Sequence, residues 1–155
     1  MTARLSKKLD NLYDRDYYLW LESTANVLSD GRWNDLDLEN LIEEIESMGR
    51  SEKRAVESNL VVLLLHLLKW LYQPSMQTGS WKGSILEHRR RLEKDLKASP
   101  SLKNYLQEVF AECYEDARLQ AAAETGLPLE TFPTASPFTA DEALNKDYLV
   151  ASEEQ

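Results

Sequence analysis

The chain of 155 residues has little of several residue types that mark particular functions. Its one cysteine, Cys113, cannot form a disulfide within the chain, and we expect a buried, inert residue in a reducing, cytoplasmic setting. Two histidines and one cysteine leave little for nucleophilic catalysis, and there is no P-loop, Gly-x-Gly-x-x-Gly or Cys-x-x-Cys motif. The first residues lack the apolar core of a signal peptide. The run 60–72 is shorter than the roughly 20 apolar residues that span a bilayer, so we expect no membrane association.

Positive charge is also scarce. The formal net charge is −9, and such acidity repels nucleic acids and anionic membranes. One segment, 82–97, departs from this with six Lys/Arg and three acids, including the run HRRR. It lacks interleaved aromatic residues and any signature of a nucleic-acid-binding fold. We therefore expect no nucleic-acid partner.

What the chain does have is helical periodicity almost throughout. Apolar residues recur at i, i+3, i+4 and i+7, and the connections are short. This predicts an all-α fold, an antiparallel helical bundle of about five long helices plus a short C-terminal helix. We expect a flexible N-terminus over 1–11, the bundle over 12–126, and a C-terminal loop and short helix packed on the bundle over 127–155.

End signals predict where each helix begins and ends. The first predicted helix runs from a cap at Asp14 or Asp16 to Gly31, and the second from Asp35 or Asp37 to Gly49, which ends or bends it. The third runs from Ser51 to Pro74, the fourth from Ser80 to Lys97, and the fifth from Ser99-Pro100 to Gly126. A capping box at Thr139 and Glu142 predicts the start of a short last helix.

Several long phrases of the sequence occur together in one order: LYDRDYYLWLE, DLENLIEEIESMGRSEKRAVES, LLLHLLKWLYQP, SWKGSILEHRRRLEKDL, SPSLKNYL and YEDARLQAAAETGL. With these phrases the chain resembles the bacterial "domain of unknown function 29" family from about Leu12 to about Tyr148. The resemblance implies an all-helical bacterial protein. It carries over no activity and no functional residue.

Carboxylates form the first candidate site. At about 100° per residue, Asp35, Glu39, Glu43 and Glu46 fall in one sector beside the apolar stripe of their helix. Oxygen ligands suit Mg²⁺ or Mn²⁺, and acids or a histidine on facing helices can complete such a site. The candidate metal ligands are Glu39, Glu43, Glu46, His66, Glu112 and Asp116. The alternative is a solvated acidic face with Glu46 paired to Arg50. A ferritin-like site is disfavoured because no Glu-x-x-His pair is present.

Buried polar residues form the second candidate site. His66 interrupts the most apolar stretch, LVVLLLHLLKWLY, and is either a core histidine with a hydrogen-bond partner or a ligand or base. Arg89 or His88 continues the apolar seam of its helix. We expect Arg89 to be buried against an acid of the second or fifth helix, Glu43 being the first choice.

Three aromatic residues, Trp70, Tyr72 and Trp81, flank the loop at 74–80 and either wall a pocket or close the end of the core. Taken together, the sequence favours a non-enzymatic interaction or assembly module that binds a protein partner or forms a homo-oligomer through an apolar face. The alternative is a divalent-metal-dependent helical hydrolase that uses the clustered carboxylates with Mg²⁺ or Mn²⁺. The substrate, ligand and pathway have no signal in the sequence.

Overall fold

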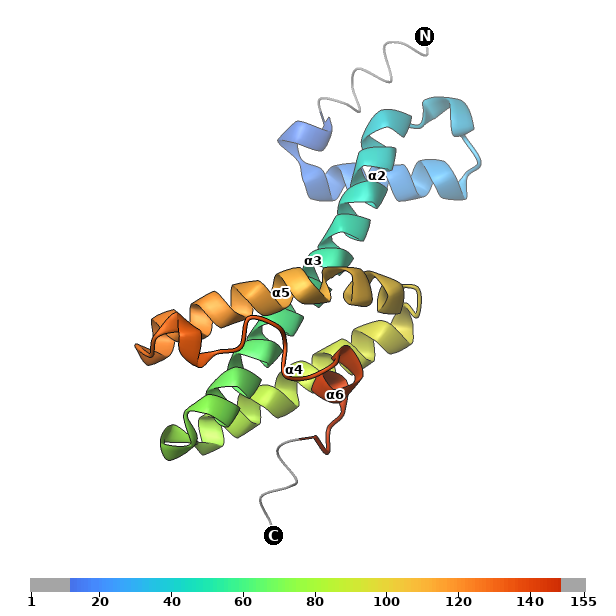
Figure 1. Ribbon diagram of the computed structural model, residues 1–155. Coiled ribbons are helices and arrows are strands. Elements are labelled where there is room, and N and C mark those ends of the chain that lie inside the picture. Colours follow the sequence, from blue (N-terminus) through green and yellow to red (C-terminus); the bar gives the residue numbers. More distant parts are fainter. Residues whose placement is uncertain (1–11, 149–155) are drawn as a thin grey trace. The chain divides into compact units, whose positions relative to one another are not determined.

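The computed structural model describes residues 12–148, which contain helices and no strand, so the predicted all-α fold is confirmed. The predicted flexible N-terminus lies outside the described residues. Residues 12–15 are helical and precede the other elements. These are, in order, α2 (Tyr17–Ser29), η1 (Trp33–Asp35), α3 (Leu38–Tyr72), η2 (Pro74–Met76), α4 (Gly79–Ala98), α5 (Leu102–Thr125), η3 (Leu129–Thr131) and α6 (Ala140–Leu144) (Figure 1).

The predicted second and third helices are one continuous helix, α3, of 35 residues. The helix does not end at Gly49, because a glycine in a helix interior costs only about 1 kcal/mol relative to alanine, which the flanking turns offset. A bend at Gly49 stays a prediction. The long helices therefore number four among the described residues, α2 to α5, where the sequence predicted about five. Asp37 accepts a hydrogen bond from the Asn40 amide at 3.4 Å, as a capping residue does.

The chain divides into two compact units, residues 1–51 and 52–155. The division at Ser51 falls inside α3, so that the helix contributes its first part to one unit and the rest to the other. It also falls inside the segment 12–126 that was predicted as one bundle, and the C-terminal segment belongs to the second unit.

The first unit consists of the helical turn at 12–15, α2, η1 and the beginning of α3. The Asp16 side chain accepts a hydrogen bond from the Leu19 amide and caps α2. Gly31 follows α2 with φ of 69°, the left-handed conformation predicted for it. Figure 1 shows the chain turning between α2 and the start of α3. The buried residues of this unit are few among those described, namely Trp20, Thr24, Val27 and Asp37.

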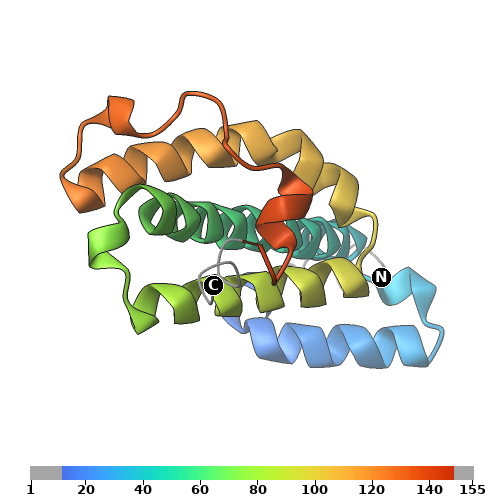
Figure 2. The same cartoon turned by 60° about the horizontal axis from the view of Figure 1, so that its bottom comes forward.

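The second unit holds the hydrophobic core. From Val56 to Trp70, eight residues of α3 are buried, and α4 and α5 cover them with regularly spaced apolar side chains. Figure 2 shows these three helices side by side, with the C-terminal segment crossing over them. That segment contributes Phe132, Phe138, Ala140 and Ala143 to the core and packs through α6 against α4 and α5. It completes a core that three helices leave open.

Helix ends in the second unit follow the predicted signals with small shifts. Thr78, not Ser80, caps α4 by accepting from the Trp81 amide. Residue 101, not Ser99, is the cap position of α5, and Ser99 instead ends α4. Gly126 ends α5 with φ of 72°, as predicted. The predicted capping box of α6 is present.

Among the described helices, α3 is long and apolar enough to cross a membrane by length and composition. The core helix of a water-soluble protein passes the same test. The absence of a membrane partner stays a prediction.

Candidate functional site

A partly buried carboxylate of the first unit links its helices. Glu44 on α3 accepts hydrogen bonds from the phenols of Tyr13 and Tyr17, whose rings pack edge to face 5.9 Å apart between centroids. The hydrogen bond to Glu44 raises the pKa of Tyr13 to about 12. The same two hydrogen bonds lower the pKa of Glu44. Glu44 therefore acts as an ionised acceptor for two neutral phenols.

A second carboxylate is buried in the first unit. The Trp20 indole donates to Asp37 Oδ2 at 3.1 Å, and the Asn40 amide side chain donates to the same oxygen at 2.8 Å. Trp20 is fully buried and packs against Tyr13 with ring centroids 4.9 Å apart. These contacts make Asp37 a structural acceptor in the interior of the unit.

Outside this interior the first unit exposes many large apolar side chains. Ten of the fourteen large hydrophobic side chains that are exposed among the described residues belong to it. They include Tyr18 at 75% exposed and Trp33 at 64% exposed. They also include a stripe along α3 at helical spacing, which we call the α3 stripe: Leu38, Ile42, Ile45 and Met48. The residues of this stripe were recognised in the sequence as apolar, but the sequence did not show that they are exposed.

The acidic sector predicted beside this stripe is solvated. Glu39, Glu43 and Glu46 are exposed, and Glu43 Oε1 lies 2.8 Å from Arg50 Nη2. The pairing of Arg50 with Glu46 is therefore wrong, and Glu43, seven residues away, takes that place. Over residues 12–148, no three His, Cys, Asp or Glu side chains are placed to hold a metal ion. A site for Mg²⁺ or Mn²⁺ stays a prediction.

Two of the candidate ligands meet in the second unit. Glu112 and Asp116 of α5 line a cavity of about 380 Å³ with Glu57 of α3, which sequence reasoning missed. Glu57 accepts a hydrogen bond from the Tyr105 phenol. Cys113 also lines the cavity, and its thiol lies 3.9 Å from the Glu57 carbonyl oxygen. Burial raises the pKa of the Cys113 thiol to about 11, so it is no nucleophile at neutral pH.

His66 is half-buried and has its hydrogen bond. Its Nδ1 lies 2.8 Å from the Val62 carbonyl oxygen, which makes Nδ1–H the donor. Burial lowers the pKa of His66, and the neighbouring Lys69 and His88 add to this effect against the hydrogen bond to Val62. Lys69 itself is paired with Glu124 at 3.0 Å. The contacts are those of a structural histidine beside a polar cluster.

Arg89 is 3% exposed, as predicted, but its expected partner is wrong. Its Nε donates to the Ala143 carbonyl oxygen at 2.8 Å and its Nη2 to that of Tyr148 at 3.1 Å. These carbonyls lie at and beyond the end of α6, where a helix has its negative pole and attracts a cation. Arg118 of α5 holds the same segment through the Phe132 carbonyl oxygen at 3.0 Å. Two buried guanidinium groups thus fix the C-terminal segment onto the core.

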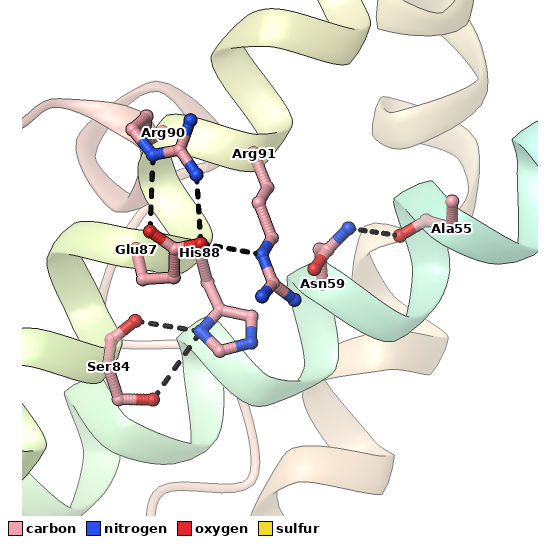
Figure 3. Close-up of polar contacts among 7 residues, drawn as sticks. All are labelled: Ala55, Asn59, Ser84, Glu87, His88, Arg90 and Arg91. Carbon is pink, nitrogen blue, oxygen red and sulfur yellow. Dashed lines mark hydrogen bonds and ion pairs between the residues drawn. The ribbon is translucent and has the colours of Figure 1, made fainter.

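The basic run on α4 is neutralised in part by its own helix. Figure 3 shows Glu87 between Arg90 and Arg91, accepting from both. These hydrogen bonds lower the pKa of Glu87 to about 2. His88 beside them has Nδ1 2.7 Å from the Ser84 carbonyl oxygen (Figure 3). Two arginines of the run, Arg90 and Arg91, are thus paired with one carboxylate of their own helix.

The three aromatic residues of the predicted pocket each have a packing role. Trp70 is buried, and the Tyr72 ring meets Phe132 edge to face with centroids 5.8 Å apart. Lys69 Nζ lies 4.8 Å from the centre of the Trp81 ring. These contacts favour closure of the core, and a ligand pocket stays a prediction.

Comparison with known families matches residues 12–149 to the family described as "Domain of unknown function DUF29". The chain belongs to this family. The resemblance seen in the sequence phrases is thereby confirmed. No curated protein and no solved structure matches the chain.

For this member of the family, the geometry therefore has to indicate the function. The residues that sequence reasoning missed are the two carboxylates of the first unit, Asp37 as a buried acceptor and Glu44, together with Glu57. No sequence pattern pairs Glu44 with Tyr13 and Tyr17, because the two tyrosines lie 31 and 27 positions before it in the chain.

Proposed function

We propose that this chain is a helical interaction module that binds another protein chain through the apolar side chains of its first unit. One observation carries the proposal: the first unit buries four described residues and exposes ten large hydrophobic ones. Exposed apolar groups at this density are typical of protein interaction sites. Two of them, Tyr18 and Trp33, are of the types that contribute most to interface energies.

The second unit serves in this proposal as the stable support. His66 and Arg89 make hydrogen bonds that hold its fold, and its one cysteine is buried. A cytoplasmic setting suits a chain with a single thiol, and its acidity disfavours nucleic acid. No observation favours the hydrolase alternative.

The test is partner retention in cells. Ile42→Ser with Ile45→Ser changes two exposed residues of the α3 stripe, and Leu86→Ser with Leu119→Ser changes two equally exposed residues of the second unit as a control. We expect cross-linking in cells followed by mass spectrometry to recover a protein with wild type and the control that the stripe variant loses. Equal recovery by all three chains would refute the proposal.

A further inference from the structure

Exposed acids border the α3 stripe on one side only. At about 100° per residue, Leu38, Ile42 and Ile45 lie within about 60° of one another around the helix. Around the helix axis, Glu46 lies about 40°, Glu39 about 60° and Glu43 about 100° beyond Ile42. Leu41 and Met48 lie on the opposite border. A ligand on the stripe would therefore meet apolar side chains at its centre and carboxylates along one edge.

The first unit carries a strongly negative net charge. Its described residues hold ten acids and three arginines, a net charge of −7. Two of the arginines are engaged, Arg32 with Asp30 and Asp35, and Arg50 with Glu43. Glu39 and Glu46 have no ion pair or hydrogen bond to a side chain within residues 12–148. Two exposed carboxylates beside an apolar stripe are thus left for a cationic partner.

Gly49 lies on the same side of α3 as the stripe, about 20° from Leu38. A Cβ built on Gly49 meets nothing within 4 Å. The helix backbone is therefore bare at this point, and a second helix can approach it closely. This gives a reason for a glycine inside a long helix that does not end there.

We propose that the α3 stripe binds a basic amphipathic helix of a partner protein, with apolar anchors on Ile42 and Ile45 and Lys or Arg beside Glu39 and Glu46. Helices bind apolar grooves and faces through anchors at i, i+3, i+4 and i+7. Charges at the rim select the partner and speed its association. A second copy of this chain is disfavoured as the occupant, because it would bring a first unit of charge −7 against another. The inference rests on the proposed function and names the chemistry of the partner.

The experiment uses the full chain and three labelled synthetic peptides. One is a Leu/Lys helix with leucines at i, i+3, i+4 and i+7, the second replaces every lysine by glutamate, and the third has the Leu/Lys composition in scrambled order. Fluorescence anisotropy gives the affinity of each. We expect the basic amphipathic helix to bind, the scrambled peptide to bind at least about tenfold more weakly, and the acidic helix not to bind. Added salt should weaken the binding.

Two variants separate the apolar contribution to peptide binding from the contribution of the carboxylates. Ile42→Ser with Ile45→Ser should weaken binding about tenfold or more and leave its salt dependence unchanged. Glu39→Gln with Glu46→Gln should weaken it about three- to tenfold and reduce the salt dependence. The matched controls, Leu86→Ser with Leu119→Ser and Glu108→Gln with Glu130→Gln, should bind as wild type does. Circular dichroism melts of all four variants exclude loss of fold as the cause.

Two results would overturn this inference in different ways. In the first, no peptide binds, but light scattering shows that the wild-type chain forms dimers and the stripe variant does not. The basic partner is then wrong and a second copy occupies the stripe, while the proposal of an interaction module stands. If no peptide binds and the stripe variant changes neither oligomeric state nor cross-linking, both proposals fail. Equal binding of the ordered and scrambled peptides would reduce the site to non-specific charge attraction and would also overturn the inference.

Discussion

The two units of this chain use apolar residues in opposite ways. In the second unit α3 is surrounded, and residues such as Leu64 and Leu67 are fully buried. In the first unit the same helix carries Leu38 and Ile45 at 58% and 56% exposed. One helix thus supplies a core in one unit and an open surface in the other. The difference shows that an amphipathic pattern reports a face to be covered without reporting what covers it.

The largest expected effect compares truncations along α3. Leu67→Ala removes a fully buried side chain and should lower the free energy of unfolding by about 2–5 kcal/mol. Ile45→Ala, on the exposed stripe, should change it by less than about 0.5 kcal/mol. Urea denaturation followed by circular dichroism measures both. Similar losses for the two variants would mean that the stripe is covered within the free protein.

A smaller effect is expected from the buried arginine of α4. Arg89→Met leaves the carbonyl oxygens of Ala143 and Tyr148 without their donors and should cost about 2–4 kcal/mol. Arg90→Met, on the exposed side of the same helix, should lower the stability far less, because it loses only a solvent-exposed pair with Glu87.

Limited proteolysis gives the second readout for Arg89→Met. Cleavage should appear first in the C-terminal segment after α5, because Arg89 holds that segment from α4. Arg89→Lys, which keeps the charge and one donor, should restore part of the protection. Cleavage that starts elsewhere in the chain would contradict the role assigned to Arg89.

The pH dependence of the first unit follows from Glu44 and its two tyrosines. The pKa of Glu44 is lowered in the fold, so the stability that it contributes is present above its unfolded pKa of about 4.5 and is lost as the pH falls through the folded pKa. The pKa of Tyr13 is raised to about 12, so its contribution is present below pH 10 and is lost as the pH rises towards 12.

Glu44→Gln separates this effect from general titration. The variant keeps an acceptor for the phenols and removes the charge, so the phenolate absorbance of Tyr13, isolated by subtracting the titration of Tyr13→Phe, should move back towards pH 10. An unchanged titration would mean that Glu44 does not control the phenol.

Much of the fold followed from the sequence, and the reasons are local. Asp16, Gly31, Gly126 and the capping box at Thr139 act within one helical turn, so their roles were readable from neighbouring residues. Gly49 misled because its cost of about 1 kcal/mol is small beside the rest of a long helix.

The candidate site was less predictable, because its contacts are long-range. Arg89 was expected to be buried from its place in the seam of α4, and this was right. Its partner was wrong because no local pattern places α6, fifty residues later, beside it. Likewise the sequence shows that Ile42 and Ile45 are apolar, but it does not show that they are exposed. They are exposed because the first unit has few elements that could cover them.

The smallest expected effect is that of divalent metal. Because Glu43 is an exposed partner of Arg50, Glu43→Ala should change stability by less than about 1 kcal/mol, and Mg²⁺ or Mn²⁺ should raise the melting temperature of neither chain. A ligand at a hundredfold excess over its Kd adds about 2.7 kcal/mol. A clear upward shift with one metal that Glu43→Ala abolishes would revive the hydrolase alternative.

The most direct measurement is amide hydrogen exchange along α3, with and without the basic amphipathic peptide. In the free chain we predict faster exchange over residues 38–51 than over 56–70, because few apolar contacts cover the first part of the helix. The peptide should slow exchange over 38–51 and leave 56–70 unchanged. Uniform protection of α3 in the free chain, or protection by the peptide that falls on α4 and α5 instead, would contradict the claim that the first unit is the binding surface of this protein.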